Sequence, residues 1–556
     1  QKARKMKKSL LLLFISTLLS TNLAWSQCAE TPVERVLLMG DSWAAMMGTD
    51  NSINIAFTKW GHSNYKFYTN SVLSENGTET VDFIQPARLT EIQTQLLARP
   101  TIDFVHISLG GNDVLGQWNK NWSQAKTDSL LDSVSARLVF IMDFIKSVRP
   151  GIRILWSGYA YPNFGEIIGD QAPFQSSHPF YGTWNGMGQP NFTQINGILN
   201  YYSTEMAAIA DNDPQIDFVN ATGLIQYAFG QATPLTITPN ASYPAFTAPL
   251  PLGYPDYPSP KNAMRNYVIF KDCFHLSPAS FEQFVGYHTR KFYQKALMDD
   301  QFLIATGGAS DGSVSAQGLV SSSLMVGNSS GDDYASVLTF NTTTMPDTGV
   351  SAATIFLRRE SLTGTNPIGS NMVLKVASGS FGASANIEPT DFQALGDANG
   401  NPCQFGTSNA DGGWIRLEVP AALLPFITHT TNTQFMLSAP GASGMVTFTG
   451  SADPELAPVL NLTYGPQTTS LAEAAPVDLE KLLMVFPNPT SNTLFINNRT
   501  GKDISKIEIV DMPGRLIYAT SSSVESIDLS NLKPGSYLVK FTTESGQLVV
   551  KRIVKR

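Results

Sequence analysis

The chain has 556 residues, with 37 Lys or Arg against 45 Asp or Glu, so its formal net charge is −8. This acidic balance argues against a nucleic-acid-binding protein, and a hydrophobic content of 42% argues against global disorder. At about 150 residues per domain, the length predicts three to four domains.

Residues 1–26 have the pattern of a secretory signal peptide. Basic residues precede the apolar run 10–19, and Ala24-Trp25-Ser26 places small residues at the −3 and −1 positions of a cleavage site. The run is too short to span a bilayer comfortably, and no other stretch is long enough. We therefore expect an exported protein, at the cell surface or secreted, with no stable membrane span.

Residues 30–299 alternate strand-like apolar runs with helical patterns. The expected strands are 33–39, 104–109 and 152–156, and the expected helices are 129–148 and 194–210. Strands this apolar suit a parallel sheet covered on both faces, and the helical segments repeat apolar residues every three or four positions. The alternation predicts a layered α/β domain.

The composition changes near residue 300. Residues 305–465 are rich in Ser, Thr, Gly and Asn, with short apolar runs between turn residues, which predicts a β-sandwich. Residues 466–482 are expected to be a linker. Residues 483–556 return to brief strands, with a hairpin-like turn at 511–514, and predict a third, small β-sandwich domain.

Residues with catalytic chemistry fall in four short blocks of the first domain. Ser42, in Gly40-Asp41-Ser42-Trp43, directly follows an expected strand, and so does Asn112, in Gly110-Gly111-Asn112-Asp113. Open α/β sheets place their sites at this carboxyl edge. In Asp272-Cys273-Phe274-His275, we expect a helical turn that puts Asp272 and His275 on one face. The fourth block is Gly77, in a loop.

These blocks, in this order, resemble the SGNH (GDSL-type) hydrolase family over roughly residues 33–295. The resemblance implies a three-layer, flavodoxin-like α/β fold and a serine hydrolase. Ser42 would be the nucleophile, His275 its base and later acid, and Asp272 the group that orients His275. The oxyanion hole would comprise the backbone amides of Ser42 and Gly77 and the side chain of Asn112.

Several residues near these blocks remain open. Trp43 replaces the usual leucine of the GDSL signature and is expected to pack behind the site. The loop around Gly77 is long, so Ser74 or Asn76 is an alternative amide donor. Asp113 is expected to cap a helix.

The remaining cysteines and candidate ligands predict little further chemistry. Both Cys28–Cys273 and Cys273–Cys403 are open as disulfide pairings. Two G-x-S-x-G segments, at 308–312 and 327–331, lie in Gly/Ser-rich sequence and are expected to be loops rather than nucleophile elbows. Since no His/Cys cluster fits zinc spacing, we expect neither a metal nor a cofactor.

The last two domains carry their own resemblances. Runs such as 336–340, 353–357 and 457–464 resemble DNRLRE-type β-sandwich modules. Phe486-Pro487-Asn488-Pro489-Thr490 and the basic end 551–556 resemble the type IX secretion sorting domain of Bacteroidetes. The second resemblance implies the type IX secretion machinery as a partner and export across the outer membrane.

The leading hypothesis is a secreted serine esterase that cleaves carboxylic esters through an acyl-enzyme, with acylated glycans as the first substrate class. A lipase or short-chain esterase is the alternative within the same chemistry. A non-catalytic surface protein that binds glycans or mediates adhesion is the alternative from another class. The segment 159–265 is rich in aromatic residues, which could bind a substrate or simply pack the insertion onto the domain.

Overall fold

The computed structural model describes residues 28–232, 235–241, 253–369, 371–406, 410–465, 483–486, 488–498, 503–512, 515–521, 524, 526–543 and 548–556. The expected leader 1–26 and linker 466–482 lie outside the described residues. Within them the chain divides into two compact units. One contains residues 33–56 and 65–292 with the C-terminal strands, and the other contains residues 28–32, 57–64 and 293–465.

The first unit is built on a five-stranded sheet. Its strands are β1 (Val33–Gly40), β2 (Tyr65–Tyr68), β3 (Phe104–Ser108), β4 (Arg153–Ser157) and β5 (Ile216–Val219). Their order is β2-β1-β3-β4-β5, and every neighbouring pair is parallel. All residues of β3 are buried, as expected for a strand covered on both faces. The predicted parallel α/β sheet is confirmed.

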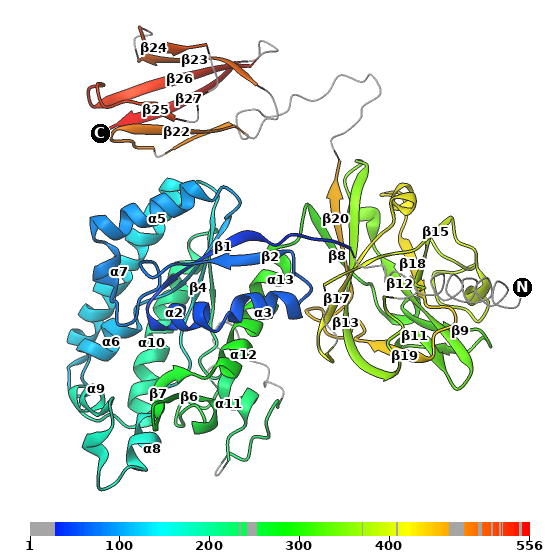
Figure 1. Ribbon diagram of the computed structural model, residues 1–556, viewed down its shortest axis with the longest axis horizontal. Helices are drawn as coiled ribbons and strands as arrows, with labels where there is room; N and C mark the ends of the chain where they lie inside the picture. Colours follow the sequence, from blue (N-terminus) through cyan, green and yellow to red (C-terminus); the bar gives the residue numbers. More distant parts are fainter. Residues whose placement is uncertain are drawn as a thin grey trace, which may run out of the picture. The chain divides into compact units, whose positions relative to one another are not determined.

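Helices cover the two faces of this sheet (Figure 1). On one face, α7 (Gln124–Val148) packs between α5 (Pro86–Ala98) and α10 (Phe192–Asp211). On the other face, α2 (Ser42–Thr49) packs against α12 (Pro278–His288) through the ring of Trp43. The remaining helices are α3 (Ser52–Lys59), α4 (Thr80–Phe83), α6 (Gly111–Gln117), α8 (Phe164–Gly169), α9 (Tyr181–Gly186), α11 (Leu224–Phe229) and α13 (Gln294–Ala296).

The long helices begin where capping residues stand. Ser123 caps α7 by accepting a hydrogen bond from the Lys126 amide. Asn191 and Gln194 form a reciprocal capping box at the start of α10. The buried positions of α7 recur every three or four residues, so one stripe of the helix faces the sheet. These local signals explain why both predicted helices are confirmed.

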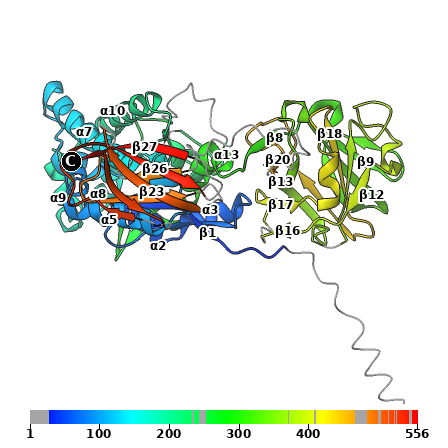
Figure 2. The same ribbon diagram turned by 90° about the horizontal axis from the view of Figure 1, so that it is seen from above.

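The second unit is a β-sandwich, as predicted. Its strands are β8 (Gln301–Ile304), β9 (Gly312–Ser315), β10 (Val320–Ser321), β11 (Leu324–Ser329), β12 (Asp332–Phe340), β13 (Val350–Gly364), β14 (Val373–Ser378), β15 (Ala398–Gly400), β16 (Gln404–Phe405), β17 (Trp414–Glu418), β18 (Thr433–Ser438), β19 (Gly444–Phe448) and β20 (Val459–Tyr464). Figure 2 shows β8, β20, β13 and β17 in one layer and β9, β12 and β18 in the other.

Strand β13 joins the two layers because it is long enough to belong to both. Its first part pairs with β17 and β20, and its last residues pair with β19. Apolar side chains from both layers, such as Leu357 and Phe435, form one buried core between them. The two G-x-S-x-G segments lie here: Ser310 ends a short 3₁₀ turn and Ser329 ends β11. Neither is a strand-to-helix elbow.

The disulfide differs from both pairings considered from the sequence. Cys28 is bonded to Cys403, with 5.5 Å between their Cα atoms, and Cys273 is a buried free thiol. The two bonded residues are 375 positions apart, so no local pattern links them. Neither of the two pairings left open from the sequence forms, because Cys273 is the free thiol.

The C-terminal strands form two small sheets. They are β21 (Leu483–Phe486), β22 (Thr493–Asn498), β23 (Ile504–Asp511), β24 (Leu516–Thr520), β25 (Ser526–Asp528), β26 (Gly535–Thr543) and β27 (Leu548–Lys555). Their orders are β21-β22-β25 and β24-β23-β26-β27, and both sheets contribute to one buried core. Among the helices of the described residues, none combines the length and apolar character that a membrane crossing requires.

Candidate active site

Ser42 is the first residue of α2, directly after β1. The turn that presents it needs a glycine at position 40, where φ is +144° and an added Cβ would lie 1.8 Å from the carbonyl oxygen of Ser108. Asp41 caps α2 by accepting a 2.9 Å hydrogen bond from the Trp43 amide. Ser42 is therefore held at the carboxyl edge of the sheet, at a helix amino terminus, where negative charge is stabilised.

Asp272 and His275 lie on a β-hairpin rather than on the helical turn expected from their spacing. The hairpin consists of β6 (Met264–Tyr267) and β7 (Phe270–Leu276). Its register shifts so that residues 272–275 lie opposite the single residue Arg265. Asp272 stabilises this bulge, since its Oδ1 accepts 2.9 Å hydrogen bonds from the amides of both Phe274 and His275. The helical expectation is wrong because a carboxylate-centred bulge produces the same proximity.

The three residues make one chain of hydrogen bonds. Nδ1 of His275 lies 2.8 Å from Oδ2 of Asp272, and Nε2 lies 2.7 Å from Oγ of Ser42. All three side chains are buried, with Asp272 completely so. An imidazole between a carboxylate and a hydroxyl can accept the hydroxyl proton while the carboxylate holds its other nitrogen protonated. The arrangement can therefore activate a serine as a nucleophile.

Asn112 is oriented by the loop that contains Gly77. Its Nδ2 donates a 3.0 Å hydrogen bond to the carbonyl of Thr78, which leaves the second N–H of the same amide for another acceptor. The Ser74 amide donates to the carbonyl of Asn70 at 3.0 Å and is engaged there. Gly77 is exposed, has φ of +82°, and lies outside the residues that line the pocket described below. Its role as an oxyanion donor stays a prediction.

Tyr159 joins the two blocks and was not predicted from the sequence. Its hydroxyl donates to Oδ2 of Asp41 at 2.6 Å and accepts from the Gly111 amide at 2.9 Å. Burial raises the pKa of the Asp41 carboxyl to about 6, although the hydrogen bonds from Tyr159 and Trp43 act in the opposite direction. The helices that begin at Ser42 and Gly111 are thereby linked through one phenol.

Asp113 is not the helix cap expected from the sequence. Gly110 occupies the cap position of α6, and Asp113 is completely buried one turn inside. Its carboxylate accepts hydrogen bonds from the amide and hydroxyl of Thr80 at 2.9 and 2.6 Å, and from Arg137 at 3.0 Å. Asp113 therefore anchors the end of the loop whose Thr78 carbonyl orients Asn112.

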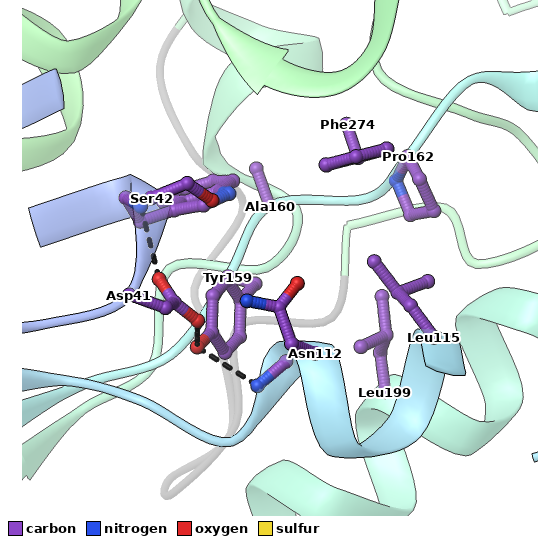
Figure 3. Close-up of a pocket in the computed structure, with 11 residues that line it drawn as sticks. Asp41, Ser42, Asn112, Leu115, Tyr159, Ala160, Pro162, Leu199 and Phe274 are labelled. Atoms are coloured by element: carbon purple, nitrogen blue, oxygen red, sulfur yellow. Dashed lines mark hydrogen bonds between the residues drawn. The ribbon is translucent and has the colours of Figure 1, made fainter. Parts of the chain in front are cut away.

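A small pocket opens beside Ser42 (Figure 3). Its volume is about 20 Å³. It is lined by Asp41, Ser42, Trp43, Gly111, Asn112, Leu115, Tyr159, Ala160, Pro162, Leu199 and Phe274. The lining is mostly apolar, so the pocket suits an uncharged, apolar group.

The aromatic residues of 159–265 differ in their burial. Tyr161, Phe164 and Tyr202 are buried, and Tyr243 lies outside the described residues. Phe180 is half-buried, with its ring centroid 4.8 Å from that of Phe274 and 6.4 Å from that of His275. Trp43 is buried behind Ser42, as expected.

Comparison with known families identifies two regions of the chain. Residues 36–284 match the family described as GDSL-like lipase/acylhydrolase, and residues 484–556 match the secretion system C-terminal sorting domain. The sorting domain indicates type IX secretion, to the cell surface or beyond. The likeness of residues 305–465 to DNRLRE-type modules is not confirmed and stays a prediction.

Among solved structures, the chain has matches of low identity that include esterases and lipases. A family 3 carbohydrate esterase from Talaromyces cellulolyticus is 12% identical, covers 47% of this chain and 98% of its own, and has a TM-score of 0.27. A family 3 carbohydrate esterase from Clostridium thermocellum is 13% identical, and the match covers 48% of this chain and 98% of that one with a TM-score of 0.26. An extracellular lipase from Streptomyces rimosus is 15% identical, and the match covers 45% of this chain and 96% of that one with a TM-score of 0.25. No curated protein matches the chain.

The parallel sheet and the family match agree for the first half of the chain. Residues 36–284 form a GDSL-like lipase/acylhydrolase domain, that of an ester-hydrolysing enzyme, and residues 484–556 form a sorting domain for secretion.

Proposed function

We propose that the protein is a secreted serine esterase that cleaves carboxylic esters through an acyl-enzyme formed on Ser42. The observation that carries the proposal is the unbroken hydrogen-bond chain from Asp272 through His275 to Ser42. Asn112 supports it, because its side chain lines the same pocket as Ser42 and retains a free N–H.

Each residue has a defined role in the proposed reaction. Oγ of Ser42 attacks the ester carbonyl while Nε2 of His275 takes its proton, and Asp272 stabilises the imidazolium. The amides of Ser42 and Gly77 and the side chain of Asn112 would donate to the oxyanion of the tetrahedral intermediate. His275 then protonates the departing alcohol, and water releases the acid by the same steps in reverse.

Fluorophosphonate labelling tests the nucleophile directly. We expect the purified protein to be labelled once, on Ser42, and Ser42→Ala to remain unlabelled. Ser310→Ala is the matched control, because Ser310 lies in a G-x-S-x-G segment outside the α/β unit, and it should be labelled like the wild type. Labelling that survives Ser42→Ala would exclude Ser42 as the nucleophile. An unlabelled wild-type protein would instead favour a non-catalytic glycan-binding or adhesion protein.

For the alcohol side of the ester we propose a glycan. Phe180 holds its ring on the His275 side, where the leaving alcohol would stand, with 6.4 Å between the two ring centroids, and an aromatic face can pack on a sugar ring. A lipid is the second candidate, and it is favoured by Val268 and Ile269, which are 88% and 85% exposed at the tip of the β6–β7 hairpin. Turnover of acylated polysaccharides but not of lipid esters would support the glycan, and the reverse would support the lipid.

A further inference from the structure

The pocket beside Ser42 has one apolar end. In Figure 3, Leu115, Leu199, Pro162 and Phe274 lie across the pocket from Ser42, Leu115 and Leu199 beyond Asn112 and the other two beyond Ala160. They come from four separate segments: α6, α10, the stretch after β4, and β7. This apolar end is the part of the pocket that a group attached to Ser42 would enter after passing Asn112.

The size of the pocket limits what can enter. The space open to the centres of water-sized groups is about 20 Å³, so only a few non-hydrogen atoms fit in it. The carbonyl oxygen and methyl group of an acetyl ester need about this space. Each additional methylene would have to displace the wall, and close-packed walls resist such insertion.

The wall is held in place from behind. Leu199 is 5% exposed, and Tyr202, on the following turn of α10, donates a 2.7 Å hydrogen bond to the carbonyl of Leu109. Next to Pro162, the Asn163 side chain donates to the carbonyl of Ser259 at 2.8 Å. Phe274 contacts the rings of Phe164 and Phe180. The apolar end is therefore a fixed wall rather than a movable flap.

The position of the pocket assigns it to the acyl side of the ester. Asn112, the proposed oxyanion donor, lines the pocket, whereas His275 does not. The leaving alcohol must meet Nε2 of His275 to receive its proton, so it departs on the His275 side of Ser42. The group that remains bonded to Ser42 extends towards Asn112 and the apolar end.

We propose that Leu115, Leu199, Pro162 and Phe274 form an acyl pocket that restricts the enzyme to acetyl esters or esters of similar size. This inference rests on the proposed function and names the acyl half of its substrate.

The test compares p-nitrophenyl acetate, butyrate and octanoate with the purified full chain. We expect kcat/KM to be highest for acetate, at least tenfold lower for butyrate and lower again for octanoate. Leu199→Ala should raise the butyrate-to-acetate ratio about tenfold, because it opens the apolar end. Leu138→Ala, which removes a fully buried leucine of α7 outside the pocket lining, should leave the ratio unchanged.

Phe274→Leu is a second variant that keeps the test decisive if Leu199→Ala does not fold, and it should shift the ratio in the same direction. A wild type that prefers butyrate or octanoate, or ratios that stay constant in the folded pocket variants, would overturn the inference. If Ser42 is labelled by a fluorophosphonate under those outcomes, the proposed function stands and only the acyl pocket fails. Absence of both labelling and turnover would overturn the proposed function and the inference with it.

Discussion

The hydroxyl of Tyr159 donates a 2.6 Å hydrogen bond to the buried carboxylate of Asp41. The same hydroxyl accepts from the Gly111 amide, so it fixes the start of the serine helix relative to the start of the Asn112 helix. The proposed nucleophile Ser42 and the proposed oxyanion donor Asn112 depend on this spacing, because small displacements of reacting groups lower the rate strongly.

Tyr159→Phe should therefore lower kcat with little change in KM. Losing a hydrogen bond to a charged group costs about 1.5–3 kcal/mol, which corresponds to a fall in kcat of roughly 10- to 100-fold if the displacement is felt in the transition state. Tyr161→Phe is the matched control, because it removes another buried hydroxyl, one that is bonded to Asn200. A variant with unchanged kcat would show that the phenol is dispensable for the reaction.

Asp272→Asn should nearly abolish turnover while the bulge of β7 persists. The amide oxygen can still accept from the Phe274 and His275 backbone, but the amide nitrogen faces Nδ1 as a donor. His275 would then carry its proton on Nε2 and be unable to accept one from Ser42. We expect kcat to fall by about 10⁴, measured with p-nitrophenyl acetate. Asp217→Asn is the control. It removes a half-exposed ion pair with Arg153 and should turn over p-nitrophenyl acetate as fast as the wild type does.

The buried His288 should contribute stability to the α/β unit that is lost in mild acid. His288 is completely buried, and desolvation lowers its pKa from 6.5 to about 4. In the unfolded chain His288 therefore binds a proton below about pH 6.5, whereas in the folded chain it binds one only below about pH 4. At 1.36 kcal/mol per pKa unit, stability worth about 3 kcal/mol is present above pH 6.5 and is lost across this window.

Thermal midpoints of the wild type and of His288→Phe, recorded between pH 7 and 4, check this expectation. As the pH falls, the melting temperature of the wild type should decrease more than that of the variant. The two plots of melting temperature against pH should therefore converge. Parallel curves would mean that His288 does not contribute to the pH dependence.

Reduction should destabilise the second unit. Cys28 and Cys403 close a loop of 375 residues, and the chain-entropy estimate for such a loop is about 4–6 kcal/mol. The double variant Cys28→Ser/Cys403→Ser should lower the melting midpoint by several degrees, whereas Cys273→Ala should keep the disulfide. Thiol titration in denaturant should find one free thiol before reduction and three after it. Three thiols before reduction would contradict the pairing.

Much of the fold could be predicted because its signals are local. The runs at 33–39 and 104–109 are apolar enough to require burial on both faces, and they became β1 and β3. The Ser42 and Asn112 blocks were recognisable as candidates because each directly follows such a strand. The same local reasoning failed at Asp272 and His275, where a spacing of three suits a helical turn and a bulge equally. Only the pairing of Met264 with Leu276 distinguishes the two.

The remaining relationships depend on distant parts of the chain. Tyr159 lies 118 positions after Asp41, and nothing in the surrounding sequence marks its hydroxyl as a link. A buried acidic residue that follows a strand needs a donor, so a search for tyrosines after the other strands of the sheet would have been a usable signal. Asp113 likewise required knowing that α4 and α7 meet beside it, because Thr80 and Arg137 come from those helices.

The β7 bulge places the proposed acid and base within four consecutive residues of one strand. Their mutual distance is therefore independent of how long the preceding segment between β5 and β6 becomes. Insertions there can reshape the surroundings of the leaving group while the contact between Asp272 and His275 stays unchanged. A scaffold of this kind can acquire new substrates by lengthening one stretch of chain, without having to rebuild its chemistry each time.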